Sequence, residues 1–319
     1  MAGFSTTNTD HLIRSNLWSN QLKKVLEDEL MGMRYVSMIT DFPDGDTINI
    51  PSFGQMEADD YAEGQAIRYT AVDTGNFTFT ISKYKSAGTY VTNKMLQDSF
   101  YMSRVQAQFV PMMQRAISKV METDMLAAIP NGQTATSTNT INGAYHRFVA
   151  SGTNETIAVE DFAKALYALK QANVPAVNLV AIVDPSLEYA FNTIPNLINF
   201  SSPNQRWESI VESGIASGTR FIKNVMGFDV YTSMNLKLNT TSEAIDGVTA
   251  AAGVNNLFFS AAPDLLPIVG LVRQPVRVDS EYNKDKQREE YVTTCRYDFG
   301  FYRPENAVVV LTDTDQIYV

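Results

Sequence analysis

The sequence predicts an α+β protein, and three observations along the chain support that class. A long helical pattern occupies residues 93–129, a mixture of helices and strands begins near residue 156, and the last third consists mostly of strand patterns. The chain has 319 residues, of which 45% are hydrophobic and 19% are charged, so it can bury a large core in one or two domains. This composition is typical of a globular protein and not of a disordered chain.

Charge, cysteine content and hydropathy narrow the class of protein further. The formal net charge of -10 argues against a protein that gains its affinity from nucleic-acid phosphates, and it favours repulsion between free subunits. The single cysteine, Cys295, excludes an intrachain disulfide. Residues 1–10 are polar and lack the apolar core of a signal peptide, and apolar runs such as residues 177–183 are far too short to span a bilayer. We therefore expect synthesis in a cytoplasm and no membrane partner.

The N-terminal region is predicted to be an extended arm over residues 1–42. It contains one short helix, because Leu22, Leu26 and Leu30 recur every four residues. The turn signal Pro43-Asp44-Gly45 ends the arm, since proline presets φ and glycine tolerates positive φ.

Residues 43–92 are predicted to form one long two-stranded excursion. In the returning strand Phe77, Phe79 and Ile81 alternate with polar residues, which is the period of a strand with one apolar face. An isolated hairpin of this kind is marginal in water. We therefore expect the excursion to gain stability by lying on something else, such as a neighbouring subunit.

The tip of the excursion carries four acids and no base over residues 54–64: Glu57, Asp59, Asp60 and Glu63. They could form a solvated loop tip or could meet a basic patch on another subunit, and both interpretations stay open. A catalytic carboxylate group is disfavoured, because no partner acid or base is identifiable. Lys83 and Lys85 follow the tip as strand charges that discourage stray edge pairing. The four acids and the two lysines are the candidate inter-subunit contacts.

A single helix is predicted over residues 93–129, roughly 50 Å long at 1.5 Å per residue. It is predicted by apolar residues that recur at three- and four-residue spacing: Met102, Val105, Phe109, Met112, Met113, Ala116, Val120 and Met121. Core packing is favoured for its methionines over a soft interface. Pro111 should kink the helix or divide it in two, and Pro130-Asn131-Gly132 should end it.

The remaining elements follow from period and turn signals. A hairpin turn is predicted at Asn142-Gly143, and the later elements are a helix over 160–172, a buried strand over 177–183, a short helix from Asp184, a strand pair within 220–233, and strands near 257–260, 268–273 and 307–311. In residues 291–302 the odd positions, Cys295 among them, form an apolar face, whereas the even positions carry Arg296 and Asp298.

Patterns that carry chemistry are not found. The two histidines, His11 and His146, lack zinc-ligand spacing, and Cys295 is interpreted as a buried small side chain. Residues 214–218 are glycine-rich but lack the lysine of a phosphate loop, and the acids of residues 41–46 mark a turn rather than a calcium site. We expect no catalytic, cofactor or metal site and therefore no enzyme.

Three passages and the order of the elements resemble one family. The passages are the helix and strand around Asn173-Val174-Pro175 in residues 162–185, the segment Gly218 to Ser233 with Gly227-Phe228-Asp229-Val230-Tyr231, and Tyr297 to Glu305 with Arg303-Pro304-Glu305. Together with an arm, a long β excursion and a long helix, they resemble the tailed-phage major capsid proteins of the Hong Kong 97 type. None of the three is a catalytic motif, and the lysine–asparagine crosslink of some relatives has no match here.

The resemblance implies a capsid fold with an arm (1–42), an extended loop (43–92), a peripheral domain (93–155 and 266–303) and an axial domain (156–265 and 304–319). It implies self-assembly through pentamers and hexamers into an icosahedral shell of the virion. A scaffolding protein, a portal and a decoration protein are the further partners that it suggests, with packaged DNA contacted non-specifically. Three rival interpretations remain. The long loop argues against an encapsulin-like nanocompartment, and the long helix argues against another virion part. The absence of a catalytic constellation argues against a cytosolic α/β enzyme.

Overall fold

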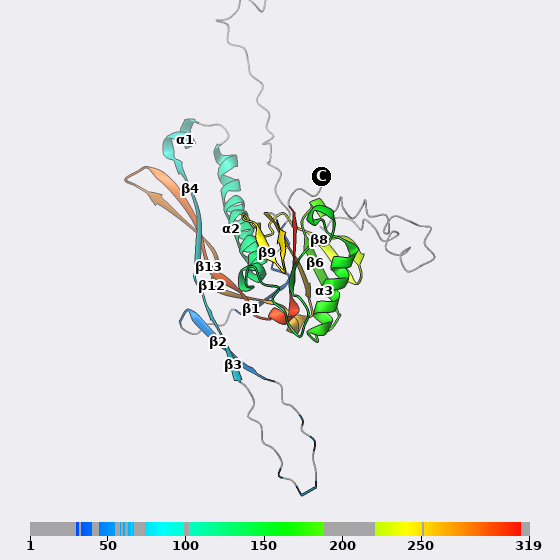
Figure 1. Cartoon of the computed structure of the whole chain (residues 1–319). Coiled ribbons are helices and arrows are strands. Elements are labelled where there is room, and N and C mark those ends of the chain that lie inside the picture. Colours follow the sequence, from blue (N-terminus) through cyan, green and yellow to red (C-terminus); the bar gives the residue numbers. More distant parts are fainter. Residues whose placement is uncertain are drawn as a thin grey trace, which may run out of the picture.

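A computed structural model describes residues 30–31, 33–39, 45–54, 58, 60, 63–64, 66, 74–98, 102–187, 221–250 and 252–313. Within these residues the chain forms a body of two sheets with helices packed on them, and a two-stranded hairpin that projects from the body (Figure 1). Helices and strands are mixed along the chain, as predicted for an α+β protein.

One sheet has four strands and is mostly antiparallel. Its strands, in spatial order, are β1 (Val36–Ile39), β12 (Ile268–Asn283), β13 (Arg288–Phe301) and β4 (Lys83–Thr92). β1 runs parallel to β12, whereas β12, β13 and β4 pair antiparallel. β12 and β13 form a long hairpin (Figure 1). Its outer part pairs with β4 and its inner end pairs with β1.

The other sheet has six strands and forms the centre of the body. Its strands, in spatial order, are β5 (Arg147–Val149), β14 (Val308–Asp313), β11 (Gly253–Ser260), β6 (Leu179–Val183), β8 (Phe228–Thr232) and β7 (Phe221–Val225). Every residue of β6 and β11 is buried, because both faces of the sheet are covered. β6 has the continuous apolar run of a strand covered on both faces. The buried strand predicted over residues 177–183 is confirmed for residues 179–183, whereas Val177 lies before the strand and is 54% exposed.

Helices cover opposite faces of the six-stranded sheet. α3 (Val159–Gln171) packs on one face, where Phe258 of β11 points toward it. The residues on either side of Phe258 point to the opposite face and join the core that contains α2 (Met102–Gly132). The alternation of a strand therefore divides β11 between two cores.

Three tight turns fix the registers of short hairpins. In each, two consecutive residues have positive φ: Asn142 (50°) and Gly143 (82°), Met226 (50°) and Gly227 (90°), and Asp246 (51°) and Gly247 (76°). This pair of conformations matches the twist of a hairpin, and glycine adopts it without steric cost at the second position. The predicted turn at Asn142-Gly143 is confirmed by the bridge between Ile141 and Ala144, and Asp246-Gly247 joins β9 (Glu243–Ile245) to β10 (Val248–Ala250).

The projecting hairpin consists of β2 (Thr47–Phe53) and β3 (Thr74–Thr80), paired antiparallel from Thr47 with Thr80 to Phe53 with Thr74. Ile48, Ile50, Phe77 and Phe79 are half-buried along one face, and the intervening residues are exposed. The alternation predicted for the returning strand is confirmed.

Two predicted elements need correction. The helix predicted over residues 93–129 is described as α1 (Asn93–Asp98) and α2, because the apolar repeat that predicted it starts only at Met102; residues 99–101 lie outside the described residues. α2 is not divided at Pro111, which lies on its exposed face, so the lost backbone hydrogen bond leaves the buried face intact. A bend at Pro111 stays a prediction.

The predicted excursion over residues 43–92 is also too long. Residues 83–92 form β4, which pairs with β13 along its whole length and belongs to the body. The odd residues of β4 face inward and Val91 is fully buried, so this strand is covered by its own chain. Two further segments pair with strands outside their predicted regions. β1, which belongs to the predicted arm, pairs with β12, and β5, which belongs to the predicted region 93–155, pairs with β14.

The hydrophobic core between α3 and the six-stranded sheet can be used to test the fold. Phe162, Phe228 and Phe258 are fully buried and make edge-to-face contacts, with ring centroids 5.1 Å apart for Phe162 and Phe258 and 5.4 Å apart for Phe228 and Phe258. Phe258→Ala should lower the free energy of unfolding by about 3–5 kcal/mol through lost burial and a cavity. The exposed Tyr84→Ala should change it by less than about 0.5 kcal/mol. Chemical denaturation of both variants measures the difference, and equal midpoints would contradict this packing.

Candidate functional site

The acidic tip is only partly within the described residues. Glu57 and Asp59 lie outside them, whereas Asp60 and Glu63 are described and are exposed between β2 and β3. A solvated tip and a contact with another subunit both require exposed carboxylates. The exposure agrees with either interpretation, and the partner of the tip stays a prediction.

The hairpin touches the body at its base. Phe77 packs edge-to-face on Tyr302, with ring centroids 5.2 Å apart, and stacks near Phe79 at 6.2 Å. Gly300 of β13 lies under Phe79, and a Cβ atom at residue 300 would come within 2.9 Å of the Phe79 ring. Close approach of the hairpin base to the body therefore depends on a glycine at this position.

A polar cluster ties the chain directly after the hairpin to α2 and β13. Lys83 Nζ lies 3.0 Å from Asp124 Oδ1 on α2 and 3.9 Å from Asp298 Oδ1 on β13. The hydroxyl of Tyr297 donates to Asp124 Oδ2 at 2.8 Å, and the backbone N–H and hydroxyl of Ser82 both donate to Asp298 Oδ2 at 2.9 and 2.7 Å. We call these five residues the hairpin-base cluster. It holds the base of the hairpin to two elements that are far away in the sequence.

Burial dominates the electrostatics of the hairpin-base cluster. Removal from water, followed by the hydrogen bond to Asp124, raises the pKa of Tyr297 well above its usual range. Tyr297 is therefore a fixed hydrogen-bond donor at every physiological pH. The cluster therefore positions a segment of chain through fixed hydrogen bonds and ion pairs.

The sequence analysis named Lys83 and Asp298 of this cluster but predicted a different environment for each. Lys83 was interpreted as an exposed strand charge, but its ammonium group is half-buried between two carboxylates of its own chain. Asp298 was placed on the outward face of its strand, but it is buried because the segment with Ser82 lies over it. Lys85 is half-buried next to Cys295, its register partner on β13. The role of the two lysines between subunits stays a prediction.

α2 presents two different faces. Met113, Ile117 and Met121 are buried in the core, as predicted for most of the methionines. Met112, which is 57% exposed, Ala116 and Val120 form a stripe at four-residue spacing on an adjacent, exposed side of the helix. The predicted apolar set therefore combined a core face with an apolar stripe that faces solvent, and Pro111 stands at the head of that stripe.

The outer face of the four-stranded sheet also exposes apolar groups. Tyr84 and Tyr90 on β4 and Val292 on β13 point away from α2. The guanidinium of Arg288 lies 4.3 Å from the centre of the Tyr90 ring, so an arginine covers part of this surface. Large exposed side chains gathered on one sheet face are typical of a contact surface.

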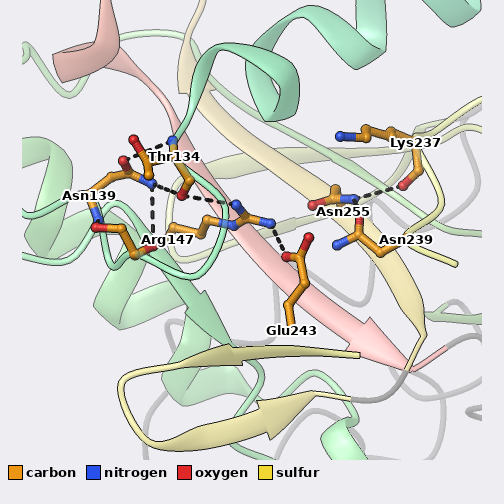
Figure 2. Close-up of polar contacts among 8 residues, drawn as sticks. Thr134, Asn139, Arg147, Lys237, Asn239, Glu243 and Asn255 are labelled. Atoms are coloured by element: carbon orange, nitrogen blue, oxygen red, sulfur yellow. Dashed lines mark hydrogen bonds and ion pairs between the residues drawn. The ribbon is translucent and has the colours of Figure 1, made fainter. Parts of the chain in front are cut away.

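A buried arginine joins three segments of the other half of the body (Figure 2). Arg147 on β5 is only 2% exposed and forms an ion pair with Glu243 on β9, while its Nη1 donates to the Thr134 carbonyl at 3.2 Å. Burial lowers the pKa of Arg147 and the charge of Glu243 opposes that shift. The pair therefore holds β5, the loop after α2 and the β9–β10 hairpin together.

Groups that could carry catalysis are few in the described part of the chain. His146 is completely buried, and burial lowers its pKa despite the backbone hydrogen bonds that favour the charged form. Cys295 is buried as predicted, and burial raises the pKa of its thiol. No cluster of three potential metal ligands occurs among the described residues. In the same residues, no helix combines the length and apolar character that crossing a bilayer requires.

The hairpin-base cluster predicts unequal effects for two neighbouring lysines. Lys83→Ala removes the cation between Asp124 and Asp298, so it should lower the free energy of unfolding by about 1–2 kcal/mol. Lys85→Ala, on the same strand but without an ion pair to the described residues, should cost less than about 0.5 kcal/mol. Denaturant unfolding and hydrogen exchange at the Ser82 amide provide the measurements. Equal costs, with an unchanged Ser82 amide, would contradict the tether.

For the buried ion pair of Arg147 and Glu243, we predict that removing one charge lowers the free energy of unfolding more than removing both. Glu243→Gln leaves the buried guanidinium without a counter-charge and should cost about 3 kcal/mol of unfolding free energy. The double variant Arg147→Met with Glu243→Leu should cost less, because it removes both buried charges. Thermal and denaturant unfolding of the two variants compare them, and a larger loss in the double variant would show that the charges themselves stabilise this region.

Known proteins share this architecture. The profile of a family described as phage capsid protein matches residues 76–310. The capsid of cyanophage P-SCSP1u has a TM-score of 0.69 and 14% identity, covering 93% of this chain and 92% of that chain. The mature capsid of bacteriophage PhiM1 has a TM-score of 0.71 and 12% identity over 98% and 95%, and a chain of Mycobacterium phage Che8 has 0.63 and 16% over 93% and 96%. No curated protein sequence matches the chain.

At these identities the structural likeness establishes the fold, which is the Hong Kong 97-type capsid fold predicted from the sequence. The family profile independently covers most of the chain, from the hairpin's returning strand to the last strand of the six-stranded sheet. On both grounds the chain belongs to the phage capsid protein family.

Proposed function

We propose that this chain is the major capsid protein of a tailed phage, and that its copies form the closed icosahedral head shell around double-stranded DNA. Membership of the phage capsid protein family supports a structural role in a shell rather than an enzymatic one. The observation that carries the proposal is the β2–β3 hairpin, which has a half-buried apolar face and packs on its own body through Phe77 and Tyr302.

The hairpin supports assembly because its apolar face is incompletely covered within one chain. Ile48, Ile50 and Phe77 stay half-exposed along a face that water disfavours, and a two-stranded hairpin alone is marginal. A neighbouring copy that covers this face would remove apolar surface from water and order the tip at the same time. Each contact can be weak, because one subunit in a closed lattice contacts several others and the contacts act together.

The two halves of the body would occupy different places in the shell. We assign the six-stranded half, with α3 and β5, to the axial domain at the centres of pentamers and hexamers. The four-stranded half, with α2 and β1, would be the peripheral domain between those centres. This assignment follows the predicted domains, with β5 moved to the axial side and β1 to the peripheral side because of their strand partners.

The proposed partners follow from the same role. The chain would contact itself in pentamers and hexamers, and would meet a scaffolding protein, a portal and a decoration protein during or after assembly in the host cytoplasm. DNA would be contained without being read, which agrees with the formal net charge of -10. The candidate contacts between subunits remain Glu57, Asp59, Asp60, Glu63, Lys83 and Lys85, with Asp60 and Glu63 exposed.

Assembly of the purified chain tests the proposal. The chain alone, or co-expressed with its scaffolding protein, should form closed shells in negative-stain images and should sediment as large particles. Shells that package DNA in the presence of the remaining head proteins would support the phage role, whereas shells that exclude DNA there would favour a nanocompartment. Monomers or dimers under all assembly conditions would refute it.

Deletion of residues 54–66 separates assembly from folding. The deletion should leave the unfolding midpoint of the free subunit unchanged, because the described residues of the tip are exposed, and should abolish shell formation. The matched control keeps the length but replaces Glu57, Asp59, Asp60 and Glu63 by Gln or Asn. Loss of shells in this control would identify a charge contact. Normal shells in the control, with none from the deletion, would show that the tip contributes without its four charges. A normal shell yield from the deletion would contradict the role of the tip.

A further inference from the structure

The chain contains two Asn-Gly dipeptides, Asn131-Gly132 and Asn142-Gly143, in different structural settings. In this dipeptide the backbone nitrogen after asparagine can reach the side-chain carbonyl carbon, because glycine has no side chain that hinders the approach. The reaction also needs a nitrogen that is free of hydrogen bonds and a backbone that can move. Both asparagines are exposed to water, so solvent access does not distinguish the two sites.

The backbone at Asn142-Gly143 meets both requirements. The turn is held by one isolated bridge, in which Ile141 and Ala144 exchange two backbone hydrogen bonds of 3.0 Å. The N–H of Gly143 has no hydrogen-bond partner among the described residues, and a Cβ atom at this glycine would meet nothing within 4 Å. The nitrogen is therefore free, and opening a single bridge lets it turn toward the Asn142 side chain.

The backbone at Asn131-Gly132 meets neither requirement. Both residues belong to the last turn of α2, where each N–H donates to the carbonyl four residues earlier. Gly132 also packs on β13, since a Cβ atom at this glycine would lie 2.5 Å from the Cβ atom of Phe301. Freeing the Gly132 nitrogen therefore requires that the end of α2 separates from the sheet.

The Asn142 side chain contributes to the end of α3. The last carbonyls of a helix need partners outside the helical ladder. The carbonyls of residues 168, 169 and 170 accept the backbone N–H groups of residues 172, 174 and 173. The remaining carbonyl, that of Gln171, accepts a hydrogen bond from Asn142 Nδ2 at 3.2 Å. A carboxylate at residue 142 could not make this bond, because it has no N–H to donate.

We propose that Asn142 is a site of spontaneous deamidation and that its modification uncaps α3. The backbone nitrogen of Gly143 attacks Asn142 Cγ and forms a new N–Cγ bond. The Cγ–Nδ2 bond breaks, and the amide nitrogen leaves as ammonia with the proton that Gly143 gives up. Solvent water then opens the cyclic imide at one of its two carbonyls, which leaves either aspartate or isoaspartate.

Either product weakens the contact between the turn and α3. The new carboxylate replaces a donor by a negative charge opposite the Gln171 carbonyl, at the helix end where the dipole disfavours negative charge. Isoaspartate also adds a methylene group to the main chain, so the two-residue turn loses its register. The inference concerns the single folded chain and does not depend on the shell function, so a failure of shell assembly would leave it untouched.

Ageing of the full chain tests the site. The folded protein is incubated in mildly alkaline buffer and digested at acid pH, where new deamidation is slow. Peptide mass spectrometry then measures replacement of amide by carboxyl at each asparagine. Asn142 should convert at least about tenfold faster than Asn131, because one bridge opens more readily than a helix end. In denaturant the two sites should convert at similar rates. Equal rates in the folded chain, no conversion of Asn142, or an unchanged preference in denaturant would overturn the proposal.

Two variants measure the effect on α3. Asn142→Asp reproduces the aspartyl product, whereas Asn142→Gly removes the donor without adding charge and tolerates the positive φ of 50°. Asn142→Asp should raise the equilibrium constant of unfolding by about three- to tenfold, and Asn142→Gly by less. Hydrogen exchange at residues 172–174 should accelerate in Asn142→Asp, with residues 279–292 unchanged. An unfolding constant and exchange rates equal to those of the unmodified chain would overturn the uncapping.

Discussion

One hydrophobic core that contains α2 and both sheets is the constraint on which the rest of the molecule depends. Met125 and Ile129 of α2 share this core with Tyr297 of the four-stranded sheet and with Leu257 of the six-stranded sheet. Neither sheet could be displaced without exposing apolar groups of the helix. Burial of this size is the dominant favourable contribution to folding, so the two sheets behave as one cooperative body.

The hairpin stands outside that constraint. Its base is fixed to the body by Phe77 on Tyr302 and by the hairpin-base cluster, but its apolar face is only half-buried. A rigid body with a firmly anchored and incompletely covered extension is the combination that a shell subunit requires. In the proposed shell, the body would keep its shape and the extension would gain its last contacts from a neighbouring copy.

Much of this fold follows from local patterns in the sequence. The alternation in residues 291–302 placed Cys295, Tyr297 and Phe299 in the core, and the Asn142-Gly143 signal placed a turn, because period and turn chemistry act over a few residues. α3 was placed to within one residue at each end. The family resemblance rested on passages of this local kind.

The sequence-based predictions were wrong where contacts with residues far away in the sequence determine the structure. Residues 83–92 have the pattern of a hairpin strand, but pairing with β13 takes them into the body. Asp298 occupies an outward position of its strand and is buried only because Ser82, distant in sequence, folds over it. Glu243 as the counter-charge of Arg147 had no signal in the sequence, since an acid near a turn is usually solvated. Non-local contacts of this kind leave no period that a single sequence reveals.

The position of β14 has a consequence for synthesis. This strand is the last one described, yet it lies inside the six-stranded sheet between β5 and β11. β5 can join the sheet only through β14, so the sheet stays open during translation until residue 313 has left the ribosome. A chain synthesised only as far as β11 therefore lacks the strand that joins β5 to the sheet, and this centre cannot close cotranslationally before β14 emerges.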